Sequence, residues 1–338
     1  MRLKLPATMK DIRAFLASLD WETLVQQVER EAQTQMAIVG SVNVGKSTLF
    51  NALKGAEISP VSSVPGTTRR PVKERLGPFL LVDTPGFGEL DGLKGVRIAL
   101  RDAESSDLFL LLLDGGAGLR RTDLLLYNEL LKSGRPVMVV LNKVDLLSKA
   151  EMSDILAHVE DRLGTDVIPI SAKKETGLPD RLFPRIIEAH PALAVSLGRA
   201  LPTYRFQAAR RLVRNASTFN ALIGAEPVPG LDLPLLLSIQ VRLVLRLAAV
   251  YGQSMTARSA KELISTIAGG MAFRYLAAEV AKLLPGVGWA ISGALAAFGT
   301  WTIGQVAIRY FDSERSLTPH RMKQLYRRLV RWRSVQDA

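Results

Sequence analysis

A glycine-rich segment between an apolar run and a stretch with helical spacing constrains this chain more than any other feature. Residues 36–39 form the apolar run, residues 40–47 read Gly-Ser-Val-Asn-Val-Gly-Lys-Ser, and residues 47–53 have the helical spacing. In the order strand, glycine loop, helix, backbone N–H groups can approach an anionic ligand, and the helix adds its positive N-terminal end. The pattern therefore predicts a loop that holds nucleotide phosphates.

Apolar runs of strand length alternate with helical stretches through the first half of the chain. The runs are residues 36–39, 79–82, 108–113, 137–141 and 167–170. Such βαβ alternation predicts an α/β fold, a doubly wound and mostly parallel sheet with ligand loops at the carboxyl ends of its strands. We expect residues 70–76 to add an antiparallel edge strand.

The loop residues can be given individual roles. Lys46 is expected to reach the β- and γ-phosphate oxygens, the Ser47 hydroxyl to coordinate Mg²⁺, and Thr48 to lie nearer the α-phosphate. The other loop residues expected to contact the nucleotide are Ser41, Val42, Asn43, Val44 and Gly45.

Two further segments follow apolar runs and carry groups suited to a nucleotide. In Asp83-Thr84-Pro85-Gly86, Asp83 can hold the metal through water, and Gly86 can offer its amide to the γ-phosphate. In Asn142-Lys143-Val144-Asp145, the Asp145 carboxylate can accept hydrogen bonds from the ring N–H and the exocyclic amine of guanine. Adenine would leave those groups mispaired, so the sequence predicts GTP and GDP as ligands rather than adenine nucleotides.

With Pro65-Gly66-Thr67-Thr68-Arg69 and Ser171-Ala172-Lys173, the set of motifs resembles GTPases of the TrmE/Era group. The resemblance implies a P-loop GTPase that hydrolyses GTP to GDP and phosphate and acts as a nucleotide-dependent switch. It implies that Thr68 completes the magnesium shell, that Lys143 lies along the purine face, and that the Ala172 amide contacts the guanine oxygen. Ser171 and Lys173 share that base-binding loop. Dimerisation across the nucleotide is also implied by this resemblance.

The position after Gly86 is Phe87, so the glutamine that positions the attacking water in Ras-like proteins is missing. We expect slow intrinsic hydrolysis. Relatives with this replacement use a bound K⁺ held partly by an asparagine of the phosphate loop, and Asn43 occupies the matching position. Val42 departs from the usual Gly-x-Pro-Asn pattern of those relatives, so K⁺ dependence is a hypothesis, to be tested by hydrolysis in KCl and in NaCl.

Charge is distributed unevenly along the 338 residues. The net formal charge is +12, with 25 basic and 25 acidic side chains in residues 1–190 but 19 basic and 7 acidic in residues 191–338. This asymmetry indicates an anionic partner for the second half, a membrane surface or a nucleic acid. The chain has no cysteine, which excludes disulfides and thiolate metal sites. With no secretory pattern at residues 1–6, we expect a cytoplasmic protein.

We expect three domains: an amphipathic helical arm at residues 1–34, a GTP-binding domain at 35–190, and a basic, apolar all-α domain at 191–338. In the arm, Asp20 is placed as a helix cap, and we expect the arm to pack on the GTP-binding domain. Residues 283–308 are uncharged, and a helix from Trp289 to about Tyr310 would be long enough to cross a bilayer.

Because a single crossing would separate two parts that both favour the cytosol, we prefer a helical hairpin, residues 259–284 and 289–310, that inserts partly or docks at a membrane surface. A soluble bundle burying the hairpin and true spanning are the alternatives. Residues 321–333 form a basic amphipathic pattern suited to anionic lipid, to RNA, or to packing on the bundle.

Residues 215–312 are similar to a helical domain of unknown function that follows Era-like GTPase domains, a resemblance that implies membrane association. The competing hypothesis is a ribosome-assembly GTPase whose basic half binds RNA. Against it, the chain shows no Gly-x-x-Gly loop in a KH-like context, and aromatic residues make up only 6%.

Overall fold

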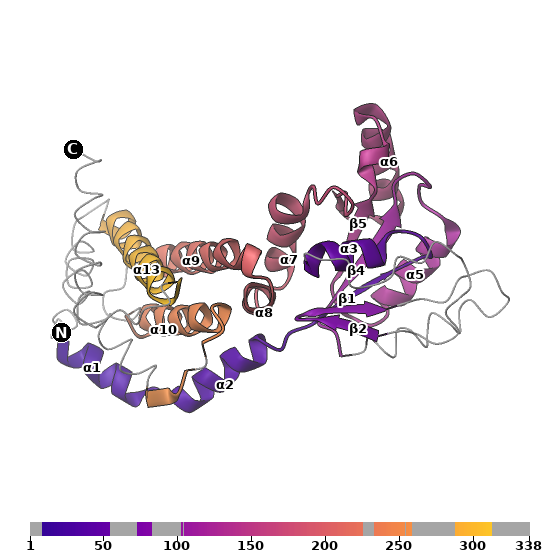
Figure 1. Cartoon of the computed structure of the whole chain (residues 1–338). Helices are drawn as coiled ribbons and strands as arrows, with labels where there is room; N and C mark the ends of the chain where they lie inside the picture. The colour runs from indigo at the N-terminus through magenta and orange to yellow at the C-terminus, as the bar shows by residue number, and fades with distance from the viewer. Residues whose placement is uncertain are drawn as a thin grey trace. The chain divides into compact units, whose positions relative to one another are not determined.

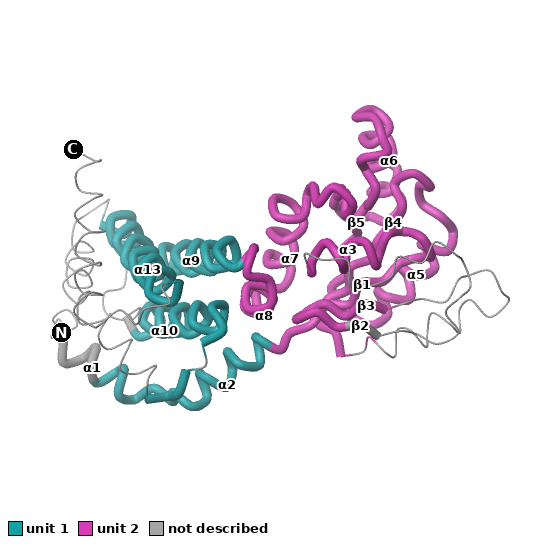
Figure 2. Tube along the Cα trace, in the orientation of Figure 1, with its two compact units in different colours: residues 1–32, 205–338 teal, residues 33–204 magenta. Residues whose placement is uncertain are grey.

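A computed structural model describes residues 9–54, 73–82, 103, 105–225, 233–253, 255–258 and 288–312 (Figure 1). The chain forms two compact units (Figure 2). One unit is residues 33–204, and the other joins residues 1–32 to residues 205–338. The three-domain division at residues 34 and 190 stays a prediction.

The unit of residues 33–204 contains a six-stranded sheet in the order β2-β3-β1-β4-β5-β6. All neighbouring strands are parallel except β2 and β3, which pair antiparallel. The strands are β1 (Met36–Gly40), β2 (Lys73–Leu76), β3 (Phe79–Val82), β4 (Leu108–Asp114), β5 (Val137–Asn142) and β6 (Val167–Pro169). The predicted α/β fold with a mostly parallel sheet is therefore confirmed.

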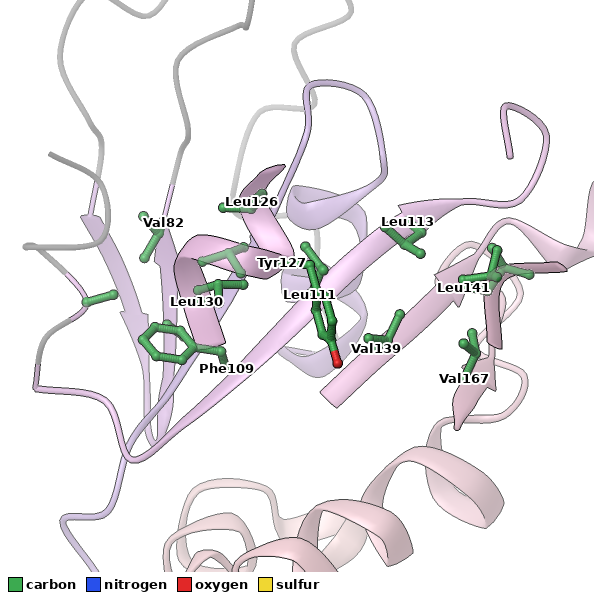
Figure 3. Packing of buried hydrophobic residues seen from close by; sticks show 14 of the residues in the cluster. Val82, Phe109, Leu111, Leu113, Leu126, Tyr127, Leu130, Val139, Leu141 and Val167 are labelled. Atoms are coloured by element: carbon green, nitrogen blue, oxygen red, sulfur yellow. The ribbon is translucent and has the colours of Figure 1, made fainter. Parts of the chain in front are cut away.

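Helices α3 (Lys46–Lys54), α5 (Arg121–Leu131) and α6 (Lys149–Leu163) pack on this sheet, because its strands other than β2 are apolar. Two further helices of the unit, α7 (Phe183–Ala189) and α8 (Leu193–Ala200), pack on each other. Figure 3 shows one face, where Leu126 and Leu130 of α5 lie against Phe109 and Leu111 of β4. Since β1 lies between β3 and β4, the loop after β1 opens where the strand order reverses, the usual place for a ligand in such sheets.

The other unit is helical. Its described helices are α1 (Met9–Ser18), α2 (Trp21–Glu31), most of α9 (Pro202–Gly224), α10 (Leu233–Val250) and α13 (Gly288–Asp312). The predicted cap of α2 is present: Asp20 accepts hydrogen bonds from the Thr23 amide at 3.0 Å and the Thr23 hydroxyl at 2.6 Å. The helix expected over residues 289–310 corresponds to α13, whereas residues 259–287 and 313–338 lie outside the described residues.

Helix α2 is held to α10 by a buried carboxylate. Glu31 accepts hydrogen bonds from Arg246 Nε at 2.6 Å, Arg246 Nη2 at 2.8 Å and Arg242 Nη2 at 2.5 Å. Burial alone would raise the pKa of Glu31, but the hydrogen bonds and charges of Arg246 and Arg242 outweigh burial and hold this pKa below its usual range. The expectation that the N-terminal helices pack on the GTP-binding domain is therefore wrong for α2, because the partners of Glu31 lie on α10.

A polar centre joins the three long helices of this unit. The buried Thr300 hydroxyl of α13 accepts hydrogen bonds from Asn220 Nδ2 of α9 at 2.6 Å and Gln240 Nε2 of α10 at 3.0 Å, and it donates to Ala296 O at 2.9 Å. Among the described helices, α13 alone is long and apolar enough to cross a bilayer by length and composition, and 56% of its most apolar window is buried. Within this structure α13 is a core helix of the bundle.

Glu31→Gln is expected to lower the free energy of unfolding by about 2 kcal/mol. This is less than the loss of a wholly buried pair, because the Arg242 side chain is 45% exposed. Since the folded pKa is lowered, the stabilisation by Glu31 is complete above the ordinary glutamate pKa of about 4.3 and is lost as the pH falls through the folded value. Urea unfolding at pH 7 and at acid pH measures both effects.

The matched control is Glu22→Gln, which changes an exposed glutamate on the same helix. We expect it to leave the unfolding free energy almost unchanged. Equal stability of the two variants at pH 7 would show that the ion pairs of Glu31 contribute nothing.

Candidate nucleotide-binding site

The glycine-rich loop leaves the carboxyl end of β1 and enters α3, as predicted. Lys46 begins α3, and its largely buried side chain turns back over the loop: Nζ donates to Gly40 O at 2.9 Å and to Ser41 O at 3.0 Å. Ser47 and Thr48 follow in the first turn of α3, both half-buried. An ammonium centred on a loop of backbone groups at a helix N-terminus suits an anionic ligand.

Asn142 connects the loop to two other segments. Its side chain is buried at the end of β5, where Nδ2 donates to Val44 O at 2.8 Å and Oδ1 accepts from the Ala172 amide at 2.9 Å. Gly45 has a φ of 95°, and a Cβ at this position would collide with Asn142 Nδ2. Glycine is therefore required at position 45 both by backbone conformation and by the closeness of Asn142.

Lys143 makes a second connection to the loop. Its Nζ donates to Asn43 O at 2.5 Å and pairs with Asp114 Oδ2 at 2.7 Å. Of the described residues other than glycine, only Asn43, Lys143 and Glu175 have a positive φ, and Asn43 and Lys143 share the value of 65°. The donor residue Lys143 and the acceptor residue Asn43 of this hydrogen bond therefore both have left-handed backbone. Local backbone strain of this kind accumulates at functional sites.

Asp145 lies two residues further on, in a turn after β5. Its Oδ1 accepts a hydrogen bond from the buried Ser171 hydroxyl at 2.6 Å, and the same hydroxyl oxygen accepts from the Lys174 amide at 3.1 Å. The contact fixes the Asp145 carboxylate beside the 171–173 loop, in which Ala172 is buried and Lys173 is exposed.

These contacts bring together the phosphate loop, the 142–145 segment and the 171–173 loop. In the sequence, the phosphate loop and the 142–145 segment are about 100 residues apart, and the 142–145 segment and the 171–173 loop are about 30 residues apart. Val42 and Asn43 form the outer part of the phosphate loop, half-buried and exposed respectively. Thr68, Asp83 and Gly86 lie outside the described residues.

Two carboxylates at the site were missed by the sequence analysis. Asp114 ends β4 and is the ion-pair partner of Lys143. Asp123, only 1% exposed, accepts from the Ser41 hydroxyl at 2.5 Å and from the Arg120 amide at 3.0 Å, so it links the phosphate loop to the start of α5. A usable signal existed for Asp114, which ends an apolar strand as Asp83 does, whereas Asp123 resembles an ordinary residue of a helical first turn.

Comparison with known proteins agrees with this geometry. Residues 35–143 match the family model described as 50S ribosome-binding GTPase, and residues 193–333 match a domain of unknown function (DUF697). Similar curated proteins include GTPase Der of Desulforudis audaxviator, 35% identical over 59% of this chain and 46% of the relative. GTPase Era of Halothermothrix orenii is 34% identical over 42% of this chain and 51% of the relative. The tRNA modification GTPase MnmE of Aquifex aeolicus is 37% identical over 43% of this chain and 32% of the relative.

Among solved structures, an Era variant of Aquifex aeolicus bound to GDP and AlF₄⁻ matches with a TM-score of 0.40 and 29% identity, covering 55% of this chain and 66% of that one. The chain spans about half or less of the length of the curated relatives described above. The fold and motifs define a GTPase domain. More particularly, residues 35–143 match the first family model and are similar to Era, Der and MnmE GTPases, and residues 193–333 match the second family model.

Proposed function

We propose that this protein binds GTP and hydrolyses it to GDP and phosphate, and that it works as a nucleotide-dependent switch. The observation that carries the proposal is the joining of three motifs by two side chains: Asn142 contacts Val44 and Ala172, and Lys143 contacts Asn43. A network that fixes the phosphate loop against the base-selecting segment is what recognition of a whole nucleotide requires.

In this proposal the phosphates lie over the loop from Ser41 to Thr48. Lys46 contacts the β- and γ-oxygens, and loop amides at Asn43, Val44 and Gly45 cradle the phosphates. The half-buried hydroxyl of Ser47, at the N-terminal turn of α3, fits the place of a magnesium ligand, and Thr68 and Asp83 would complete the site. Mg²⁺ supplies neutralisation of charge on the β- and γ-phosphates.

Base selection falls to Asp145. Because Ser171 binds Oδ1 of its carboxylate, the group is held in one orientation, and it accepts from the ring N–H and the exocyclic amine of guanine. Lys143 lies along the purine face. Ala172 offers the backbone amide for the guanine oxygen, and Ser171 and Lys173 complete this loop.

Hydrolysis proceeds by attack of water on the γ-phosphate, with no covalent intermediate. The Gly86 amide and Thr68 would contact the γ-phosphate and its metal. The direct test is phosphate release from GTP and from ATP by the full chain, with Lys46→Ala as the inactive variant. We expect release from GTP alone and its loss in the variant; equal release from both nucleotides would refute the proposal.

K⁺ is proposed as the further cation, with Asn43 as one of its ligands. Asn43 is exposed at the outer part of the loop, so its side chain is accessible to such an ion. We expect faster GTP hydrolysis in KCl than in NaCl at equal ionic strength, and weaker stimulation in Asn43→Ala. Identical rates in the two salts would remove K⁺ from the account.

Ser41→Ala is expected to weaken GDP binding about tenfold, the effect of losing one hydrogen bond to a charged group. The Ser41 hydroxyl donates to Asp123, and the Ser41 carbonyl accepts from Lys46. The loss of the hydroxyl should therefore relax the phosphate loop while the backbone of Ser41 and the Lys46 side chain are kept. Ser41→Thr keeps the hydroxyl and should recover most of the affinity in calorimetry. Unchanged affinity in Ser41→Ala would show that the Asp123 contact does not position the loop.

We further propose that the helical unit is the effector and associates with an anionic membrane surface on the cytoplasmic side. The 19 basic against 7 acidic side chains of residues 191–338 support this role. A homodimer formed across the nucleotide would be a further level of control. Fractionation of the full chain with GDP and with a non-hydrolysable GTP analogue tests the membrane role: nucleotide-dependent membrane binding supports it, and a wholly soluble chain in both states contradicts it.

RNA binding is the second candidate, favoured by the description of the matched family as ribosome-binding and by the same basic half. Co-sedimentation separates the candidates. Recovery with ribosomal subunits but not with anionic liposomes would select RNA, and the reverse result would select the membrane.

A further inference from the structure

One end of the helical unit brings together the end of α9 and the starts of α10 and α13. Asn220 Nδ2, on the last turns of α9, donates to Leu236 O near the start of α10 at 3.4 Å. A Cβ built on Gly224, the last residue of α9, would lie 2.6 Å from Ala296 Cβ of α13 and 3.3 Å from Gly293 Cα. We call this end of the three helices the apolar end, for the side chains that it exposes.

Large apolar side chains gather at the apolar end. In the described part of the chain nine such side chains are exposed, and five of them belong to the first or last turns of these three helices. They are Phe219 (56% exposed), Leu222 (66%), Leu235 (50%), Trp289 (54%) and Ile291 (40%). Single exposed apolar residues are ordinary, but a group drawn from three helices at one place indicates a partner.

The charged residues of α9 and α10, the helices behind the apolar end, are all basic, whereas the connection between them, outside the described residues, contains Glu226 and Asp232. Helices α9 and α10 contain six arginines and no acidic residue, and both arginines of α10 pair with Glu31 of α2. Arg210 and Arg214 are exposed on α9. At 1.5 Å per residue, Arg214 lies about 7 Å and Arg210 about 13 Å along the helix axis from Phe219. The two arginines of α9 therefore lie at fixed distances from Phe219 along the helix axis, toward the start of α9.

That spacing matches the depth profile of a lipid surface. Interfacial protein segments bury apolar side chains about 5–10 Å into the boundary between headgroups and acyl chains, with basic side chains near the lipid phosphates. RNA would use aromatic rings for stacking, and of the five side chains only Phe219 and Trp289 have one, whereas Leu222, Leu235 and Ile291 are aliphatic. We propose that the apolar end enters an anionic phospholipid surface end-on, with Arg210 and Arg214 at the phosphates; this rests on the membrane role proposed above.

The absence of cysteine makes a site-specific test possible, because one introduced cysteine is a unique labelling site. Leu222→Cys reports on the apolar end, and Leu131→Cys, at an exposed leucine that ends α5, is the matched control. Each full-length variant carries an environment-sensitive nitrobenzoxadiazole label and is mixed with phosphatidylcholine vesicles, with or without phosphatidylglycerol. We expect the label at 222 to brighten several-fold and shift to the blue only with phosphatidylglycerol, and the label at 131 not to change.

A second pair of variants tests the arginines. Arg210→Gln with Arg214→Gln should weaken binding to phosphatidylglycerol vesicles about 30-fold, because each basic side chain near such a surface contributes about fivefold. Arg181→Gln, which removes an exposed arginine from the GTPase unit, should leave binding unchanged. Equal binding by all three proteins would overturn the role of the arginines.

Other results with the label overturn the proposed surface in distinct ways. A blue-shifted label at 222 before vesicles are added means that another part of the chain covers the apolar end, and a shift that depends on protein concentration means that a second copy does. A shift with ribosomal subunits but not vesicles selects RNA. If the chain sediments with vesicles while the label stays unchanged, only this surface is wrong; if it does not sediment, the membrane role fails as well.

Discussion

Replacing Asp145 by asparagine is expected to lower the affinity for GDP about 100-fold or more. The carboxylate accepts two hydrogen bonds from guanine in our account, and the asparagine amide would place a donor against a donor, a change of about 3 kcal/mol. Xanthosine diphosphate has an oxygen where guanine has its amine, so this variant should bind it better than GDP. Calorimetry with both diphosphates measures the exchange of preference.

The variant should fold normally, since Oδ1 of asparagine can still accept from the Ser171 hydroxyl as Asp145 does. Asp154→Asn, on the exposed side of α6, is the control and should bind GDP as the unchanged chain does. If Asp145→Asn kept full affinity for GDP, Asp145 could not be the residue that selects the base.

Gly45→Ala is expected to lower nucleotide affinity more than 100-fold. The φ of 95° disfavours any side chain, at about 1–3 kcal/mol. The new Cβ would also displace Asn142, whose bonds to Val44 O and the Ala172 amide contribute about 0.5–1.5 kcal/mol each. Fluorescence titration with a labelled GDP analogue measures the loss.

Gly118→Ala separates the two causes. Gly118 also has a positive φ, 65°, but a Cβ there would meet nothing within 4 Å. This control should lose a little stability and keep its nucleotide affinity. If Gly45→Ala bound the nucleotide as tightly as Gly118→Ala, the contact of Asn142 with the loop would not contribute to nucleotide binding.

The sheet and the nucleotide loops could be predicted because their signals are local. Every strand except β2 contains a continuous apolar run, and residues 40–47 and 142–145 have spacings that only a few structures require. The same holds for the Asp20 cap, whose partner Thr23 is three residues away.

The contacts that the sequence did not disclose are made between distant residues by common side chains. Glu31 and Arg246 are 215 positions apart, and Ser41 and Asp123 are 82 apart. No local pattern distinguishes Glu31 from an exposed glutamate such as Glu22 on the same helix. Only the packing of α2 on α10 makes Glu31 a buried ion-pair partner, and for that reason the sequence assigned α2 to the wrong neighbour.

The apolar composition of α13 was similarly ambiguous. Length and hydropathy fit a bilayer helix and a core helix equally well. In this structure Thr300 joins α13 to the bundle, because its hydroxyl accepts from Asn220 and Gln240 of two other helices. A membrane role that keeps these contacts would use a surface of the intact bundle, and the apolar end meets that requirement.

Isothermal titration of the full chain with GDP and with ADP, in the presence of Mg²⁺, tests the central claim most directly. We predict a single site for GDP and no measurable binding of ADP, because Asn142, Lys143 and Asp145 are proposed to select guanine. Equal affinity for the two nucleotides, or binding of neither, would contradict it.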